Sequence, residues 1–403
     1  MTDRRTEDLW RTLAPQVLGA LVRRYGHFDE AEDAVQEALL AAATQWPRDG
    51  MPDDPRAWLI TVAARRLVDR LRSESARERR ELATAWADPT DTPPAVAAED
   101  DTLTLLTLCC HPALSPPSQV ALALRAVAGL TTAQVAHAYL VPETTMAQRI
   151  SRAKQAIRDA GGRFDQPASA DLRAVLHVLY LVFNEGYAST RGVGLVDVQL
   201  SQEAIRLARV AHTLRPQDGE VTGLLALMLL TDARRAGRLD ADGELVTLAD
   251  QDRSRWDRSL ILEGVALVEQ ALSTSAPGPY QVQAAIAAVH AEAPTAAETD
   301  WPQILALYDV LAAHEPGATV RLNRAVAVAM VRGPEAALRD LAALARDPRM
   351  ARHHRYHAVR AHLLEQAGRE VEAHDAYRLA ADLATSEPEH RYLAGRAGRL
   401  GSG

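Results

Sequence analysis

The stretch LTTAQVAHAYLVPETTMAQRISRAKQAIR, residues 130–158, decides how the first part of this chain folds. Thr131 or Thr132 can cap a short helix because a threonine hydroxyl accepts a hydrogen bond from a free backbone N–H. A tight turn at residues 140–142 follows, and residues 143–145 open a second helix. A short helix, a turn and a polar second helix predict a helix-turn-helix, which places its second helix in the major groove of DNA.

The second helix of this motif carries side chains that suit DNA. Arginine can bind guanine through two hydrogen bonds and glutamine can do so with adenine, while the other cations hold phosphates. The alternative is a solvated helix with a few arginines. The candidate contacts are Gln148, Arg149, Ser151, Arg152 and Lys154, the only lysine of the chain.

A second basic helix is expected before this motif. Residues 29–46 (DEAEDAVQEALLAAATQW) predict an amphipathic helix with its acidic and amide groups on one face. Residues 52–80 follow, with eight arginines against three acids from Arg56 onward, and with Trp58 on the apolar face. A basic helix beside an aromatic side chain can follow a phosphate backbone and receive an unstacked base. Taken alone, this segment also reads as an ordinary charged helix.

The rest of the chain predicts helices as well. Apolar residues recur at spacings of three and four, and no convincing alternating segment occurs, so we expect an all-α protein. Residues 88–101 (DPTDTPPAVAAEDD) are acidic and rich in proline, which predicts a linker. A second break at GGRFDQPAS precedes about ten further helical segments from residue 170 onward.

The final part of the chain suggests a repeat. Residues 322–348 and 359–388 share one layout, with an apolar helix, a glycine turn, an alanine-rich helix and a terminal proline. Gly333 and Gly368 lie 35 positions apart, close to the period of about 34 of tetratricopeptide units. This spacing predicts stacked helical pairs; a general helical bundle is the alternative.

Composition limits the possible functions. The formal charge of −8 argues against a protein that coats DNA or anionic membranes unaided. Cys109 and Cys110 are neighbours, so we expect small buried hydrophobes and no disulfide. The start, MTDRRTEDLW, lacks the apolar stretch of a signal peptide, and no run of about 18 apolar residues occurs. We therefore expect a cytoplasmic protein without a membrane span.

Together these segments resemble the sigma-70 family of bacterial transcription initiation factors, in its small extracytoplasmic-function (ECF) branch. EDAVQEALLAA resembles the region 2 helix that binds the clamp helices of RNA polymerase, and WLITVAARRLVDRLR resembles the helix that reads and opens the −10 element. Residues 114–158 resemble region 4, which binds the −35 element and the polymerase flap. The resemblance implies region 2 in residues 1–85, an acidic linker in 86–103 and region 4 in 104–162.

The resemblance also assigns roles to individual residues. It places Asp33, Gln36 and Glu37 on core polymerase, and it places Trp58, Arg65 and Arg66 at the −10 element. In region 4 it assigns −35 contacts to Gln148, Arg149, Ser151, Arg152 and Lys154. The loop DGMPDDP, Ala147 and the turn VPETT depart from the usual pattern of the family, which puts a base-holding role of that loop and the usual −35 readout in doubt.

Residues 170–403 extend beyond an ordinary member of this branch. Phrases such as LYLVFNEGY and LADQDRSRWD resemble a subgroup in which a tetratricopeptide-like domain is fused to the sigma module and controls it. We expect that domain to bind a peptide, a small molecule or another protein through a concave surface. Candidate surface residues are Trp256, Tyr280, Trp301 and Tyr308, although core packing is the simpler reading of each. A packed junction with the sigma module is expected at Tyr180, Phe183, Asn184, Glu185 and Tyr187.

An enzyme is not expected. Possible acid, base or metal groups are scattered and form no nucleophile, phosphate-loop or paired-histidine signature. They are Glu185, Asp250, Asp252, Asp257, His290 and His314. DADGE (240–244) is only faintly like a calcium loop. We predict no cofactor and no metal. The leading function is a sigma factor that joins core RNA polymerase and recognises a two-part promoter; the alternative is a stand-alone helix-turn-helix regulator with a sensing domain.

Overall fold

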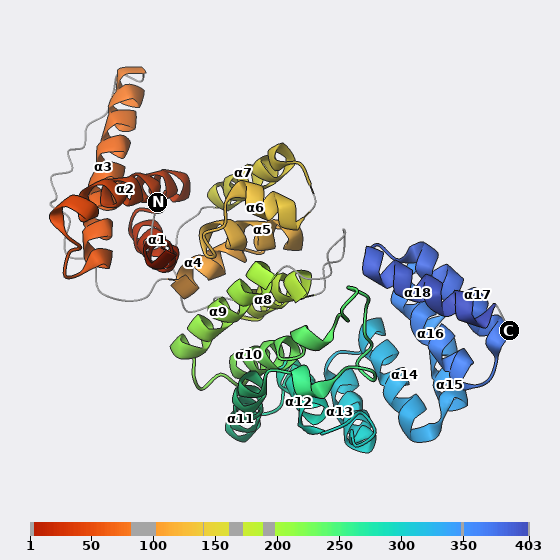
Figure 1. Ribbon diagram of the computed structural model, residues 1–403. Helices are drawn as coiled ribbons and strands as arrows, with labels where there is room; N and C mark the ends of the chain where they lie inside the picture. Colours follow the sequence, from red (N-terminus) through yellow and green to blue (C-terminus); the bar gives the residue numbers. More distant parts are fainter. Residues whose placement is uncertain are drawn as a thin grey trace. The chain divides into compact units, whose positions relative to one another are not determined.

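The computed structural model describes residues 4–81, 102–139, 141–160, 172–187, 198–347 and 350–401. Helices make up its regular structure, and the described residues contain no strand beyond one isolated bridge between Leu239 and Leu245 (Figure 1). The predicted all-α class is confirmed. The chain forms two compact units, Met1–Leu179 and Tyr180–Gly403, and the boundary falls inside one helix, α8 (Leu172–Tyr187).

Three helices begin the N-terminal unit: α1 (Arg4–Tyr25), α2 (Phe28–Asp49) and α3 (Pro55–Glu81). The helices α1, α2 and α3 pack on one another in pairs, as their apolar stripes require. The buried side chains at the centre are aliphatic or small: Val17, Leu21, Val35, Ala38, Leu59, Ala63 and Leu67.

Four helices follow in this unit, before its last residues in the first half of α8: α4 (Thr102–Cys109), α5 (Pro116–Ala126), α6 (Thr132–Ala138) and α7 (Glu143–Asp159). The predicted cap is confirmed, because the Thr131 hydroxyl accepts a hydrogen bond from the Gln134 N–H and the Gln134 side chain accepts one from the Thr131 N–H. The linker expected at residues 86–103 lies outside the described residues up to residue 101, as do Leu140 of the turn and the Gly-Gly break. Cys109 and Cys110 are both buried and form no disulfide, as predicted.

The C-terminal unit begins within α8 and continues with α9 (Val198–Leu214), α10 (Gly219–Asp232), α11 (Arg258–Thr274), α12 (Pro279–Glu292) and α13 (Trp301–His314). Two short 3₁₀ helices, η2 (Arg235–Gly237) and η3 (Arg253–Arg255), connect α10 to α11. The helix α10 packs against α9, α11 and α12, so eleven of its fourteen residues are buried. It is the central helix of this region.

The remaining helices are α14 (Ala318–Arg332), α15 (Pro334–Leu344), η4 (Met350–Arg352), α16 (His354–Gln366), α17 (Glu370–Leu383) and α18 (Glu387–Leu400). The two predicted helical pairs are present as α14–α15 and α16–α17. Gly333 and Gly368 have φ of 85° and 73°, a left-handed conformation that favours glycine at both turns. Pro388 does not only stop the second pair, since it also lies in the first turn of α18.

None of the helices in the described part of the chain is long and apolar enough to cross a membrane.

Candidate functional site

The exposed face of α7 is the first part of the candidate site. Met146, Ile150, Ala153 and Ile157 point into the N-terminal unit, which is the period-3.6 stripe that fixes the orientation of the helix. The opposite face leaves Gln148, Ser151 and Arg152 exposed, and with Ala147 these residues line a shallow groove open to solvent. No hydrogen bond or ion pair joins Gln148 or Arg152 to another residue that the structure describes. These side chains are available to a ligand.

Arg149 lies at the edge of this face. Its guanidinium carbon is 5.6 Å from the centre of the Tyr139 ring, a cation–π distance that orients the arginine. Tyr139 follows α6, so this contact links the two helices of the helix-turn-helix.

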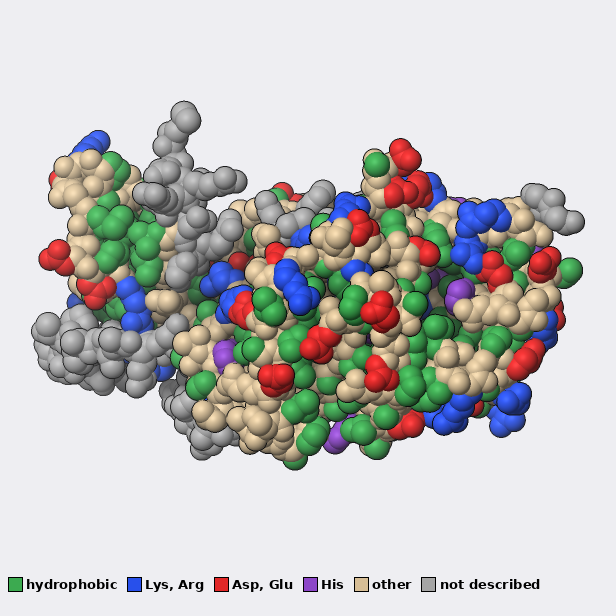
Figure 2. Space-filling model, turned by 60° about the horizontal axis from the view of Figure 1, so that its bottom comes forward, with side chains coloured by type: hydrophobic (Ala, Val, Ile, Leu, Met, Phe, Trp, Pro, Cys, Tyr) green, Lys and Arg blue, Asp and Glu red, His purple; other side chains and the backbone are tan. Residues whose placement is uncertain are grey.

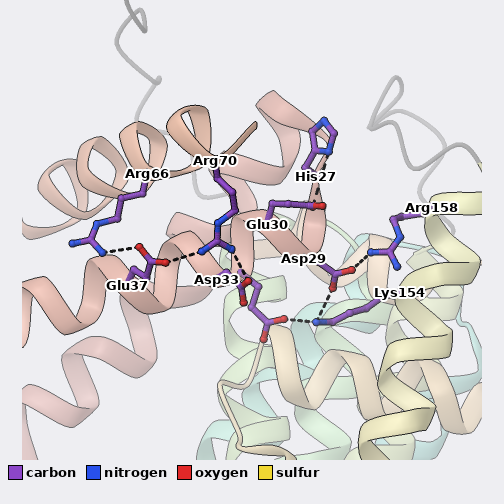
Figure 3. A network of polar contacts seen from close by, with 10 residues as sticks. His27, Asp29, Glu30, Asp33, Glu37, Arg66, Arg70, Lys154 and Arg158 are labelled. Carbon is purple, nitrogen blue, oxygen red and sulfur yellow. Dashed lines mark hydrogen bonds and ion pairs between the residues drawn. The ribbon is translucent and has the colours of Figure 1, made fainter. Parts of the chain in front are cut away.

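Lys154 does not share the exposed face. Its ammonium group lies 3.0 Å from Asp29 Oδ1 and also binds the carboxylate of Glu32, both on α2 (Figure 3). Arg158, one turn further along α7, pairs with Asp29 as well. The helix-turn-helix is thus joined by ion pairs to the first block of helices.

Glu32 is the most enclosed acid of this network. Only 10% of its side chain is exposed, and 15% of that of Lys154. A nitrogen of Arg125, on α5, lies 2.8 Å from the second carboxylate oxygen of Glu32. A carboxylate so far removed from water is costly unless it is paired, and here two cations from the helix-turn-helix block satisfy it.

A different face of α2 holds the second part of the candidate site. Asp33 binds Arg70 at 2.6 Å, and Glu37 binds both Arg66 and Arg70 at 2.7 Å, so α2 is tied to the basic helix α3 (Figure 3). These ion pairs are more exposed to solvent than the Glu32 pair, since 66% of the Asp33 side chain and 40% of the Glu37 side chain are exposed. Gln36 is also exposed between them.

The apolar Leu40 follows on the same side of α2, one turn after Gln36, and 69% of it is exposed. An isolated leucine on a surface is common. Here Leu40 extends a row of exposed polar residues along one side of α2. A helix of a binding partner can pack along such a row.

The residues of α3 that were predicted to contact DNA differ in how deeply their side chains are buried. Trp58 is half-buried and meets Trp46 of α2 edge to face, with ring centres 5.5 Å apart. Arg65 is exposed, and the described residues give it no hydrogen bond or ion pair. Arg66 is the residue already paired with Glu37.

The acidic groups of α2 divide between two neighbouring helices. Asp29 and Glu32 face α7, whereas Asp33 and Glu37 face α3. The inward network of Asp29, Glu32, Arg125 and Arg158 was not predicted. A signal was present for Glu32, because it lies beside the buried positions Ala31 and Val35 of the helix.

Charge elsewhere on the surface is mixed. On the face shown in Figure 2, Asp and Glu side chains are interspersed with Lys and Arg and no large basic patch forms. This agrees with the net charge of −8 and leaves local stripes such as the α7 face as the DNA-compatible surfaces.

The five residues predicted to form a junction lie on the second half of α8, in the C-terminal unit. Tyr180 meets Tyr280 edge to face at 5.6 Å, and the buried Phe183 stacks on Tyr187 at 5.6 Å. Asn184 and Glu185 are half-buried on the same helix. The helix continues through Asn184 to Tyr187.

The aromatic residues expected on a concave surface pack against the hydrophobic core to different extents. Trp256 is buried at 6% exposure, while Tyr280, Trp301 and Tyr308 are half-buried. Core packing is therefore the correct reading of Trp256, and the other three also reach solvent.

Several acids that might have suggested chemistry have structural roles. Asp252 caps η3 and Asp257 caps α11, and hydrogen bonds from neighbouring serines lower the pKa of both carboxylates. Asp240 accepts backbone hydrogen bonds from Asp242 and Glu244, which closes the loop that faintly resembled a calcium site. Within the described residues, no group of three His, Cys, Asp or Glu side chains is arranged to hold a metal.

Comparison with known proteins gives the N-terminal unit a family. Residues 9–77 match the model of sigma-70 region 2. The chain is 31% identical over 164 residues to the probable ECF RNA polymerase sigma factor SigI of Mycobacterium tuberculosis (strain CDC 1551 / Oshkosh), covering 38% of this chain and 53% of SigI. It is 34% identical over 161 residues to the ECF RNA polymerase sigma factor SigJ of strain H37Rv, covering 37% and 48%. The chain is thus similar to ECF sigma factors of the sigma-70 family over part of its length, and residues 9–77 match sigma-70 region 2.

Two further matches come from proteins of unknown function. Residues 171–272 match a family of unknown function, DUF6596. An uncharacterized protein of Rhizobium meliloti (strain 1021) is 43% identical over 405 residues, covering 98% of this chain and 95% of that protein. The chain spans about half the length of SigI and SigJ. No solved structure matches it significantly.

Proposed function

We propose that this chain binds core RNA polymerase in the cytoplasm and directs transcription from a two-part promoter. One observation carries the proposal: a helix-turn-helix with an open Gln148–Ser151–Arg152 face lies in the same compact unit as a sigma-70 region 2. In the proposal, residues 1–85 are region 2, 86–103 a connector, 104–162 region 4 and 170–403 a regulatory domain. The chain itself performs no covalent chemistry.

In this proposal, region 4 reads the −35 element with the exposed face of α7. Gln148 and Arg152 contact base edges, because both residue types can form paired hydrogen bonds to one base. Ser151 and Arg149 hold the backbone. Region 4 also contacts the polymerase flap.

The polymerase clamp helices bind the face of α2 that carries Asp33, Gln36 and Glu37, together with Leu40. The ion pairs to Arg66 and Arg70 hold these carboxylates in place. Because the pairs are exposed to solvent, the carboxylates can exchange partners at a low cost in free energy. Exposed Leu40 supplies the apolar contact that polar residues alone lack.

At the −10 element, the exposed Arg65 contacts DNA directly. Arg66 becomes available when polymerase takes over its partner Glu37. Trp58, fixed against Trp46, provides an aromatic surface for an unstacked base.

Promoter binding requires α7 to leave α2. Lys154 Nζ is 3.0 Å from Asp29, whereas a single helical turn of DNA is about 34 Å long. Modules that read two elements separated by a turn or more cannot keep this ion pair. Lys154 is then released from α2 and can bind a phosphate. The arrangement of Figure 3 is thus the form that the protein takes before it binds DNA.

We extend the proposal to the C-terminal unit, which regulates the sigma module. Its support is that the matches to SigI and SigJ cover 38% and 37% of the chain, whereas the match to a Rhizobium relative covers 98% of it. A partner or ligand of this unit would then set the activity of the N-terminal unit.

Run-off transcription tests the proposal. Purified core RNA polymerase is combined with the full chain and with DNA from upstream of the neighbouring genes. A transcript that depends on the chain supports sigma activity, and unchanged core activity on all templates contradicts it. DNA binding without core polymerase, together with no transcript, would instead indicate a stand-alone helix-turn-helix regulator.

A matched pair of variants tests the polymerase face. Leu40→Asp introduces a charge into the exposed α2 face and is expected to abolish binding to core polymerase. Gln45→Asp introduces the same charge at an exposed position of α2 outside that face, and should bind normally. Equal binding of both variants would contradict the assignment of this face.

A further inference from the structure

The helices of the C-terminal unit from α10 to α18 pack mainly on their neighbours in the chain. The principal contacts of each helix are with the next helix or the next but one. An array of this kind is held along its length by the interfaces between neighbours. A contact between its two ends can therefore be made or lost without breaking any interface between helices.

One ion pair joins the two ends of this array. The Nε of Arg391, on α18, lies 2.9 Å from the Oε1 of Glu244, in the connection that follows α10. The two residues are 147 positions apart in the sequence. Glu387, one turn before Arg391 on α18, lies 3.7 Å from the same guanidinium and helps to orient it. The last helix of the array is thus tied back to its beginning.

Glu244 belongs to a short hairpin, residues 238–246. The backbone N–H of Val246 donates to the carbonyl of Arg238 at 2.9 Å, and that of Asp240 donates to the carbonyl of Glu244 at 3.0 Å. The Asp240 carboxylate accepts two further backbone hydrogen bonds within the hairpin, both at 2.9 Å. Because these hydrogen bonds join its two legs and its tip, the hairpin moves as one piece.

The first residue of the hairpin holds the end of α8. The guanidinium of Arg238 donates to the Tyr187 carbonyl and lies 4.1 Å from the centre of the Tyr187 ring. A cation at the C-terminal end of a helix satisfies free carbonyls and interacts favourably with the helix dipole. Tyr187 is the last residue of α8, and the boundary between the two units falls within this helix. The hairpin therefore connects α18 with the helix that the two units share.

The ion pair between the hairpin and α18 is exposed to solvent. The exposed fractions of the Arg391 and Glu244 side chains are 41% and 44%. An exposed ion pair changes an equilibrium by about fivefold at most, and salt screens it. A contact of this strength suits a protein that exchanges between two conformations, because a modest difference in binding is then enough to shift their populations.

We propose that the Glu244–Arg391 ion pair is a clasp that opens and closes the helical array α10–α18. In the closed form, the clasp holds the hairpin from one side while Arg238 grips the end of α8 on the other. In the open form α18 moves away from the hairpin, and the hairpin holds the end of α8 less firmly. The inference does not rest on sigma activity, because the clasp and the residues it holds all belong to the C-terminal unit.

A distance measurement on the full chain tests the clasp. Spin labels are attached at two exposed positions, Ala241→Cys on the hairpin and Leu379→Cys on α17, while the two native cysteines are buried. We expect Arg391→Glu, which places a like charge against Glu244, to give a longer and broader distance distribution by pulsed electron paramagnetic resonance. In the labelled chain without that change, raising NaCl from about 0.05 M to about 1 M should act in the same direction.

Matched variants show whether the effect comes from this ion pair. Arg399→Glu makes the same change at an exposed arginine two turns further along α18 and should leave the distance unchanged. Glu244→Arg combined with Arg391→Glu restores an opposite pair and should recover the short distance. Circular dichroism checks the folding of each variant, and Arg391→Gln replaces Arg391→Glu if the latter does not fold.

Three outcomes would overturn the clasp. They are an unchanged distance in the Arg391 variant, an equal change in Arg399→Glu, and a charge swap that leaves the distance long.

Hydrogen exchange of the full chain tests the attachment to α8. We expect Arg391→Glu to speed amide exchange in residues 184–187 by about two- to fivefold, the factor by which loss of an exposed ion pair changes a local opening equilibrium. Arg238→Gln removes the grip on α8 directly and should speed exchange there at least as much. If Arg391→Glu leaves exchange in residues 184–187 unchanged, the clasp does not reach α8 and this part of the proposal is wrong.

Discussion

One buried network in the N-terminal unit and one arginine in the C-terminal unit differ in how their charges are paired. In the N-terminal unit, Asp29 and Glu32 meet Lys154, Arg158 and Arg125, and every group of this network has a partner of opposite charge. In the C-terminal unit, Arg235 pairs with Asp232, whereas the neighbouring Arg234 is half-buried and the described residues offer it no hydrogen-bond or ion-pair partner. Paired charges hold helices in one arrangement, whereas an unpaired cation holds none.

This difference concerns what each charge can hold together. The ion pairs between α2 and α7 can hold the sigma module in one conformation, and they disappear if the helices separate. Arg234 holds no such pair of elements together in the described part of the chain.

The largest expected effect comes from reversing the charge at the centre of the paired network. Glu32→Lys places a third cation against Lys154 and Arg125, and breaking a buried ion pair costs about 3–5 kcal/mol. The contact between α2 and α7 should open. The distance between spin labels attached at Ala43→Cys on α2 and Ala160→Cys after α7 can be measured by pulsed electron paramagnetic resonance. If the two helices separate, the distance distribution becomes longer and broader.

The matched control reverses both charges. Glu32→Lys combined with Lys154→Glu restores one opposite pair and should recover most of the original short distance. If Glu32→Lys alone keeps the original distance, the ion pairs do not hold the two blocks together. The structural role given above to the paired charges of the N-terminal unit would then be wrong.

A second test uses the unpaired region. Because His290 has a pKa of about 4 when folded and near 6.5 when unfolded, the unfolded chain binds more protons between these values. Stability is therefore complete above about pH 6.5 and is lost as the pH falls toward 4, by at most about 1.4 kcal/mol per pH unit. Denaturant unfolding of the full chain at a series of pH values measures this slope.

His290→Gln removes the titrating group and should flatten that slope. Burial lowers the pKa of His353 and His362 as well, so part of the slope is expected to remain. An unchanged slope in His290→Gln would show that burial of this imidazole does not set the pH dependence of stability.

Arg152 offers a third test, because it is an exposed cation without a carboxylate inside the N-terminal unit. If it contacts a base, Arg152→Ala should weaken binding of the polymerase complex to the cognate −35 sequence by about 1–3 kcal/mol, with less loss on altered sequences. Gln155→Ala, on the same helix, is the control. Equal loss on all sequences would make Arg152 a phosphate contact.

The smallest effect on stability is expected at the solvent-exposed ion pairs of α2. Glu37→Gln removes the partner of Arg66 and one partner of Arg70, and exposed pairs contribute less than about 1 kcal/mol. Thermal melting should shift by a few degrees at most, and less at high salt. A loss as large as that of Glu32→Lys would erase the distinction between the exposed and buried faces of α2.

Local features of this fold could be predicted from the sequence. The Thr131 cap depends on a residue three positions away, and the exposure of Gln148, Ser151 and Arg152 follows from helical periodicity alone. Gly333 and Gly368 mark turns for a reason intrinsic to glycine. In each case the information lies within one or two helical turns.

The remaining features depend on residues distant in sequence. Lys154 reads as a DNA contact from its own helix, but its partner Glu32 lies 122 positions earlier. The end of α8 also depends on a distant residue, because Arg238, 51 positions after Tyr187, caps it. Such contacts arise from packing, which no local pattern encodes.

The adjacent cysteines have a practical consequence. Burial raises the pKa of the Cys109 thiol well above its usual value, and both side chains are shut off from solvent between α4 and α5. A thiolate is the reactive form, so alkylation must wait for this part of the chain to open. The rate at which iodoacetamide modifies the native protein would therefore measure how often the helix-turn-helix block opens locally. No label needs to be introduced for this measurement.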